Sequence, residues 1–273
     1  MSIQPAEEKR QVGVYQEYLE NSSQPLTCFF FALPFFLIYH GGLWWLSSFS
    51  GLKWANAADI AIADALGRLG MAGPLISFIV VVIVFLAKQN FAARPWRMVP
   101  LATWPLMILE SSVFALPLFM LSRLVTHVID SVNLWSLVLN GNEAGSFPSQ
   151  AGLILSCGAG VYEEFLFRLI LMGSMLFVLD KVFGVTGGWK YVLAAVTQAV
   201  LFALSHHLPG SPEELTSFAD FRLLLPAFSF RVVAGVYFAF LYIERGFGIA
   251  AGSHAIYDLF LVAMDNVLLD FGD

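Results

Sequence analysis

The sequence predicts an all-α fold: a polytopic helical membrane protein with about seven to eight transmembrane helices and additional interfacial helices. Of its 273 residues, 58% are hydrophobic and only 12% are charged, whereas a soluble domain carries about 25% charged residues. Apolar runs long enough to cross a bilayer, which takes about 20 residues, recur along most of the chain. This composition excludes a soluble enzyme and makes membrane lipid a partner. No Lys/Arg cluster follows a nucleic-acid backbone, so no nucleic-acid partner is expected.

Seven apolar segments are predicted to cross the membrane. The first ends at Trp44 and Trp45, an aromatic pair of the kind that anchors helices at the membrane interface. The fourth exceeds the hydrocarbon thickness at about 1.5 Å per residue, so it is expected to be tilted or broken. In order, the segments are residues 26–47, 71–87, 98–121, 151–179, 191–208, 223–243 and 247–264.

Two stretches between these segments are expected not to cross. Residues 53–69 place apolar side chains at helical spacing beside Asp59, Asp64 and Arg68, which is typical of a helix lying in the interface. Residues 125–150 mix polar residues with Gly and Pro, and we expect a partly helical, water-facing excursion there.

The chain divides into three predicted regions. Residues 1–25 form a solvated N-terminal extension, residues 26–150 form N-terminal transmembrane helices with interfacial segments, and residues 151–270 form the transmembrane core that carries the chemistry. Basic residues favour the cytoplasmic side of a membrane, so the most basic loop, 88–97, and the N-terminus are placed inside. This orientation puts Lys9, Arg10, Lys88, Arg94, Arg97, Lys181, Lys190 and Arg245 inside, and Lys53, Arg68, Arg123 and Arg222 outside.

The fourth segment contains three ionisable residues within an apolar helix: Glu163, Glu164 and Arg168. At the centre of a membrane helix each charge costs about 2.5 to 3.5 kcal/mol before any pairing. Glu164 and Arg168 are spaced i,i+4 with the acid first, so they can pair on one face. Glu163 points about 100° away and has no partner within the motif. A carboxylate of this kind, facing a polar cavity, can act as a general base; the alternative is a purely structural buried network.

Two later segments carry histidines. His206 lies at the end of the fifth segment, and the seventh contains His254 and Asp258 at i,i+4 on one face. That spacing predicts that the carboxylate fixes the tautomer and orientation of the imidazole. Gly248 and Gly252 form a small-xxx-small pair that allows a neighbouring helix to pack closely. Because polar groups are rarely tolerated in hydrocarbon unless they converge, we expect the three polar segments to share one site.

Three motifs follow in order on successive predicted crossings: Glu163-Glu164-x-x-x-Arg168, Phe202-x-x-x-His206 and His254-x-x-x-Asp258. This ordered set resembles the CAAX-protease and bacteriocin-processing (CPBP) family of intramembrane endopeptidases, which includes the Rce1-type prenyl-protein proteases. The resemblance covers residues 151–265, under half of the chain. The first half resembles no family.

The resemblance implies a peptidase that hydrolyses a peptide bond of a membrane-associated peptide or protein. Glu163 with His206 would activate water, while His254 and residue 258 would help hold the oxyanion. Asp258 can donate a hydrogen bond only when protonated, so its expected role is to orient His254. The residues implied to support the site are Glu164 and Arg168.

Three alternatives remain open from the sequence. A zinc-dependent version of the peptidase would use Glu163, His206 and His254 as ligands; the metal-free version without a cofactor is favoured because no His-Glu-x-x-His helix is present. A transporter would place buried charges along an ion pathway, and a non-catalytic immunity or scaffold protein would keep the fold without turnover. The expected location is a bacterial cytoplasmic membrane, with the protein as an integral component.

Overall fold

The computed structural model describes residues 13, 15–50, 55–73, 75–91, 100–131, 149–207 and 218–270, and every element within them is helical. The prediction of an all-α fold is therefore confirmed for the described part of the chain. In chain order the elements are α2 (Pro25–Ser50), α3 (Ala57–Arg68), α4 (Ile76–Phe91), α5 (Thr103–Ser131), α7 (Ser149–Gly158), the π-helix η1 (Ala159–Met172), α8 (Gly173–Lys181), α9 (Trp189–Ser205), α10 (Phe218–Arg245) and α11 (Phe247–Asp270).

Four stretches of these helices are long and apolar enough to cross a membrane, so the chain is an integral membrane protein. Two shorter apolar helices, α4 and α9, accompany them. The finer count of seven to eight crossings stays a prediction. The four long stretches are Pro25–Phe49, Thr103–His127, Leu225–Arg245 and Phe247–Met264.

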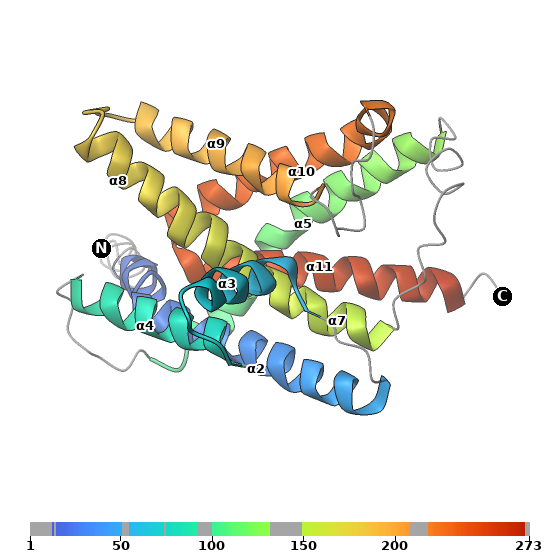
Figure 1. The fold of residues 1–273 in the computed structure, drawn as a ribbon, viewed down its shortest axis with the longest axis horizontal. Helices are drawn as coiled ribbons and strands as arrows, with labels where there is room; N and C mark the ends of the chain where they lie inside the picture. Colours follow the sequence, from blue (N-terminus) through green and yellow to red (C-terminus); the bar gives the residue numbers. More distant parts are fainter. Residues whose placement is uncertain are drawn as a thin grey trace, which may run out of the picture.

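Helices α7 and α8 lie end to end with η1 between them, and together they form a rod through the middle of the bundle (Figure 1). The rod corresponds to the predicted fourth segment, 151–179. Its central 14 residues are wound as a π-helix, a rare form that occurs mostly as short insertions at functional sites. In Figure 1, α9 and α10 lie along one side of this rod and α2 and α4 along the other, and α3 packs across it against η1 and α4.

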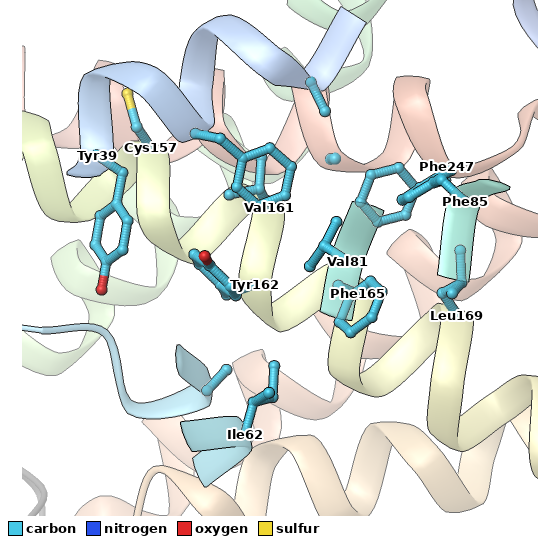
Figure 2. Close-up of a cluster of buried hydrophobic side chains, with 14 of the residues drawn as sticks. Tyr39, Ile62, Val81, Phe85, Cys157, Val161, Tyr162, Phe165, Leu169 and Phe247 are labelled. Atoms are coloured by element: carbon cyan, nitrogen blue, oxygen red, sulfur yellow. The ribbon is translucent and has the colours of Figure 1, made fainter. Parts of the chain in front are cut away.

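One face of η1 forms the largest apolar core. Its residues Val161, Phe165 and Leu169 recur every four positions, so they share a face of the helix and point the same way. Figure 2 shows these side chains meeting residues from four other helices. The partners labelled there are Tyr39 of α2, Ile62 of α3, Val81 and Phe85 of α4, and Phe247 of α11.

On another side, η1 approaches α11 closely at Gly160. A Cβ at Gly160 would lie 2.5 Å from Ala255 Cβ and 2.6 Å from the Ala255 backbone nitrogen. A side chain larger than hydrogen does not fit there. The glycine therefore sets the distance between the helix that carries the two glutamates and the helix that carries His254.

The small-residue pair predicted in α11 also packs closely. A Cβ at Gly248 would lie 2.9 Å from Met107, and one at Gly252 would lie 2.6 Å from Ser111 Oγ, both on α5. The close packing expected from this pair is confirmed. Gly246, the single residue between α10 and α11, has a φ of 82°, which favours glycine and allows the sharp turn.

The described end of the predicted N-terminal extension is packed against the bundle. Ser22 is fully buried and accepts a hydrogen bond from Arg245 at 3.1 Å. Tyr18 donates to Glu110 of α5, whose carboxylate is also paired with Arg245. The expectation of a solvated stretch is thus wrong for this end, because these side chains join a buried ion pair.

Parts of two other predictions lie outside the described residues. Within the predicted excursion 125–150, α5 continues to Ser131 and α7 begins at Ser149, and the residues between them are not described. Arg94 and Arg97, which define the basic loop, are likewise outside the described residues.

Candidate active site

Glu163 lies on η1 with 8% of its surface exposed, at the centre of a polar cluster. The cluster consists of Glu163, Glu164, Arg168, His206, His254 and Asp258. Its Oε1 accepts a hydrogen bond of 2.9 Å from Asn56 Nδ2. Its Oε2 lies 4.0 Å from His206 Nε2 and 3.9 Å from His254 Nε2. Within the described residues this buried oxygen has no direct hydrogen-bond partner. The three segments that the sequence expected to share one site do converge.

His206 follows the last residue of α9 and caps that helix. Its Nδ1 lies 2.9 Å from the carbonyl oxygen of Phe202, one turn earlier. A carbonyl oxygen can only accept, so Nδ1 must carry the hydrogen. In the neutral ring Nε2 is then a hydrogen-bond acceptor, and it is this nitrogen that faces Glu163.

His254 is held by Glu164. Its Nδ1 lies 2.7 Å from Glu164 Oε1, so Nδ1–H donates to the carboxylate. The ring also stacks on Phe238, with a centroid distance of 4.5 Å and an interplanar angle of 16°. These two contacts fix the plane of the imidazole and leave Nε2 directed toward Glu163.

The sequence assigned the orienting role to Asp258, and the structure adds Glu164 as a second carboxylate beside His254. Asp258 Oδ2 lies 3.6 Å from His254 Nε2, longer than a hydrogen bond and on the other nitrogen of the ring. The i,i+4 spacing did place Asp258 on the correct face of α11. The close approach of η1 at Gly160, however, brings Glu164 nearer to the ring, so Glu164 orients His254 as well as pairing with Arg168.

Arg168 lies one helical turn after Glu164 on η1 and forms an ion pair with it. Its Nη1 lies 3.1 Å from Glu164 Oε1, and both side chains are fully buried. The i,i+4 ion pair predicted from the sequence is therefore confirmed. The guanidinium also lies over the rings of Phe202 and Phe238, at 4.6 and 5.5 Å from their centroids, and donates to the Gly235 carbonyl at 3.4 Å.

Carboxylates surround the His254 imidazole. Three of them lie within 4 Å of its ring nitrogens, from Glu164, Asp258 and Glu163. When both ring nitrogens carry a hydrogen, Nδ1–H donates to Glu164 and Nε2–H can donate to an oxygen that develops negative charge.

Comparison with known families identifies the part of the chain that holds this cluster. Residues 146–260 match the family model described as type II CAAX prenyl endopeptidase Rce1-like. The match covers 115 of the 273 residues and shows that this region is similar to the family. The match confirms the resemblance to the CPBP family that the three motifs indicated. No curated protein and no solved structure matches the chain.

One polar residue of the cluster comes from outside the Rce1-like region. Asn56 lies in the connection that leads into α3, the helix predicted to lie in the interface, and it is 9% exposed. Its amide donates to Glu163 across 107 positions of sequence. The sequence analysis missed this residue. The one local signal was that Asn is favoured at the N-cap of a helix. This preference accounts for the Oδ1 atom but does not indicate which residue the Nδ2 atom contacts.

The zinc-dependent alternative would bring Glu163, His206 and His254 onto one ion. Glu163 Oε2 lies within 4.0 Å of both His206 Nε2 and His254 Nε2. Among the described residues, however, no group of three or more His, Cys, Asp or Glu side chains could hold a metal ion.

Proposed function

We propose that this protein is an intramembrane endopeptidase of the CAAX prenyl protease and bacteriocin-processing type, located in a bacterial cytoplasmic membrane. It hydrolyses a peptide bond of a membrane-associated peptide or protein with water activated by Glu163. The observation that carries the proposal is the position of Glu163 Oε2, buried between His206 Nε2 and His254 Nε2 at 4.0 and 3.9 Å. The family match to residues 146–260 supports a peptidase.

Glu163 and His206 are suited to activating water. Their separation of 4.0 Å is too long for a direct hydrogen bond, yet a single water molecule can bridge two such groups. Since Glu163 Oε2 and the neutral His206 Nε2 are both acceptors, the water would donate a hydrogen to each. Its oxygen lone pair would then be directed at the scissile carbonyl carbon.

The reaction then needs no group other than these side chains. The water oxygen bonds to the carbonyl carbon, one of its protons passes to Glu163, and the carbonyl oxygen takes the negative charge. His254 Nε2–H donates to that oxygen, as an oxyanion hole does. When the intermediate collapses, the C–N bond breaks and the proton moves from Glu163 to the leaving nitrogen, which restores the carboxylate.

Substitution of Glu163 by Gln tests the proposal. Glu163→Gln keeps the shape and the hydrogen bond from Asn56 but cannot take a proton, so kcat should fall at least about 100-fold with KM nearly unchanged. Cleavage is followed with the purified protein in detergent, using an internally quenched peptide that ends in a prenylated Cys-a-a-X sequence. The matched control is Glu244→Gln, the same change on an exposed residue of α10, which should retain full activity.

Two outcomes would contradict parts of the proposal. Normal turnover by Glu163→Gln would remove the catalytic assignment of that residue. Activity that is lost with a chelator and restored by zinc would support the zinc-dependent version instead. If wild-type protein does not cleave the prenylated peptide, crosslinking of Glu163→Ala in cells, followed by mass spectrometry of the retained chains, tests for a different membrane-associated substrate.

A further inference from the structure

Two polar groups of Asn56 are fixed by residues of α2 and α3. Its Oδ1 accepts a hydrogen bond of 2.9 Å from the Ala58 backbone N–H and thereby caps α3. Its own backbone N–H donates to the hydroxyl of Tyr39 at 2.8 Å, and that hydroxyl donates to Asp59 at 3.0 Å. Tyr39 is fully buried in α2. The residue is thus held between the end of the α2–α3 connection and the first turn of α3.

The cap determines which end of the Asn56 amide faces Glu163. Because Oδ1 is committed to the Ala58 N–H, the NH₂ group is the end that remains for Glu163, and Nδ2 lies 2.9 Å from Glu163 Oε1. Rotating the amide by half a turn would break the cap and place an oxygen against a carboxylate. The donor toward Glu163 is therefore fixed by the start of α3.

This hydrogen bond also distinguishes the two oxygens of Glu163. With Oε1 occupied by Asn56, Oε2 is the oxygen that faces His206 and His254. The bond therefore determines which oxygen of the base faces the two histidines.

We propose that Asn56 is a positioning residue for the reaction, which holds Glu163 with Oε2 turned toward the two histidines. The inference rests on the proposed function. It assigns part of the active site to α3 and its cap, which lie outside the matched region 146–260. The first half of the chain is then a component of the site and not only its membrane scaffold.

Two substitutions separate the cap from the donor. Asn56→Asp and Asn56→Ser both keep a side chain that caps helices well, so α3 should stay formed. The melting temperature of Asn56→Ser in detergent should therefore stay above that of Asn56→Ala, which loses the cap as well as the donor. Asn56→Asp replaces the amide donor with a carboxylate, which cannot donate to Glu163 Oε1 and repels it, so kcat on the prenylated peptide should fall at least about 10-fold with KM nearly unchanged.

Asn56→Ser removes the amide donor without adding charge. For this variant kcat on the prenylated peptide should fall about 10- to 100-fold, the range that corresponds to a lost hydrogen bond to a charged group, with KM within about twofold of the wild type. The control is Arg68→Ala at the other end of α3, whose exposed ion pair with Asp64 is far from Glu163 in sequence and should be dispensable. Its kcat and KM should match those of the wild type.

The outcomes distinguish this inference from the proposed function. If Asn56→Asp and Asn56→Ser both keep the wild-type kcat while Glu163→Gln is inactive, Asn56 serves only as a cap and the inference fails. If Glu163→Gln is itself fully active, the proposed function fails first. A melting temperature that falls in Asn56→Ser as much as in Asn56→Ala, with an unchanged kcat of the folded protein, would also overturn the positioning role.

Discussion

Glu164 contacts two basic side chains at once, which explains how several ionisable groups are buried together. Its Oε1 lies 3.1 Å from Arg168 Nη1 and 2.7 Å from His254 Nδ1. A buried charge is costly unless it is paired and hydrogen-bonded. The guanidinium pairs with the Glu164 carboxylate, and the imidazole adds a hydrogen bond to the same oxygen. Structure and chemistry therefore depend on the same acid.

The ion pair in the site should contribute far more than the ion pair with the same spacing on α3. Arg168→Ala leaves Glu164 buried with one partner fewer and should destabilise the protein by about 3 to 5 kcal/mol. Arg68→Ala removes an i,i+4 pair whose side chains are 79% and 61% exposed, and exposed pairs are worth at most about 1 kcal/mol. Thermal unfolding of both detergent-solubilised variants gives the comparison. Equal melting temperatures would mean that Arg168 is not a structural anchor.

The two polar residues of α11 should differ in their effect on turnover. His254→Ala removes the proposed oxyanion donor and should cost about 3 to 4 kcal/mol of transition-state stabilisation, or roughly 100- to 1,000-fold in kcat. Asp258→Asn should be milder, because Glu164 and not Asp258 makes the orienting hydrogen bond to His254. The measurement is kcat of both variants on the prenylated peptide. A larger loss for Asp258→Asn would return the principal role to Asp258.

At the scale of elements, the site depends on how closely η1 and α11 approach. Glu163 and Glu164 follow Gly160 on one helix, and His254 precedes Ala255 on the other, so the closest backbone contact lies within one turn of the polar cluster. Helix interfaces in membranes use small residues in this way. The glycine sets the distance over which Glu164 reaches the imidazole.

Gly160→Ala should therefore reduce both stability and activity. The added Cβ would lie 2.6 and 2.7 Å from the backbone nitrogen and Cα of Ala255, and backbone atoms can yield only if α11 moves away. Gly173→Ala is the matched control, since it lies at the start of α8 on the same rod with no atom within 4 Å of the new Cβ. Melting temperature and kcat should both fall for the first variant and stay constant for the second, where alanine also favours the helix. Normal behaviour of Gly160→Ala would show that the approach at this point is not limiting.

The helices themselves were largely predictable from hydropathy, and their contacts were not. The predicted segment 26–47 corresponds to α2 and segment 191–208 to α9, because continuous apolar runs mark such helices directly. The π winding of η1 and the packing of α3 against it depend on tertiary contacts that leave no periodic pattern in the sequence. Element ends were also missed where polar residues continue a helix, as at the end of α5.

For the whole molecule, the sequence indicated which residues converge but not which contacts each residue makes. Ionisable side chains in apolar segments marked Glu163, His206 and His254, since such groups are rarely tolerated without partners. The role of Asp258 in orienting His254 stays a prediction: its carboxylate lies 3.6 Å from His254 Nε2, whereas Glu164, from another helix, accepts the hydrogen bond from Nδ1. Asn56 was missed because a polar residue outside the apolar runs carries no comparable signal.

The proposed seven crossings make a prediction about sidedness. Asn56 follows the first predicted crossing and His206 ends the fifth, so both lie after an odd number of crossings and on the same side; this agrees with their shared proximity to Glu163. The loop between α8 and α9 follows the fourth crossing and lies on the opposite side. The positive-inside rule places that loop in the cytoplasm, together with the basic loop 88–97.

Single cysteines at two exposed positions test this arrangement. Ala65→Cys on α3 and Thr186→Cys in the α8–α9 loop are introduced after Cys28 and Cys157, both buried, are replaced by Ala. A membrane-impermeant maleimide added to intact cells should label position 65, whereas position 186 should be labelled only after the membrane is permeabilised. Labelling of both positions from one side would overturn the count of seven crossings. Opposite labelling would keep the count and reverse the orientation, because the relative sides follow from the number of crossings and only the absolute direction rests on the distribution of basic residues.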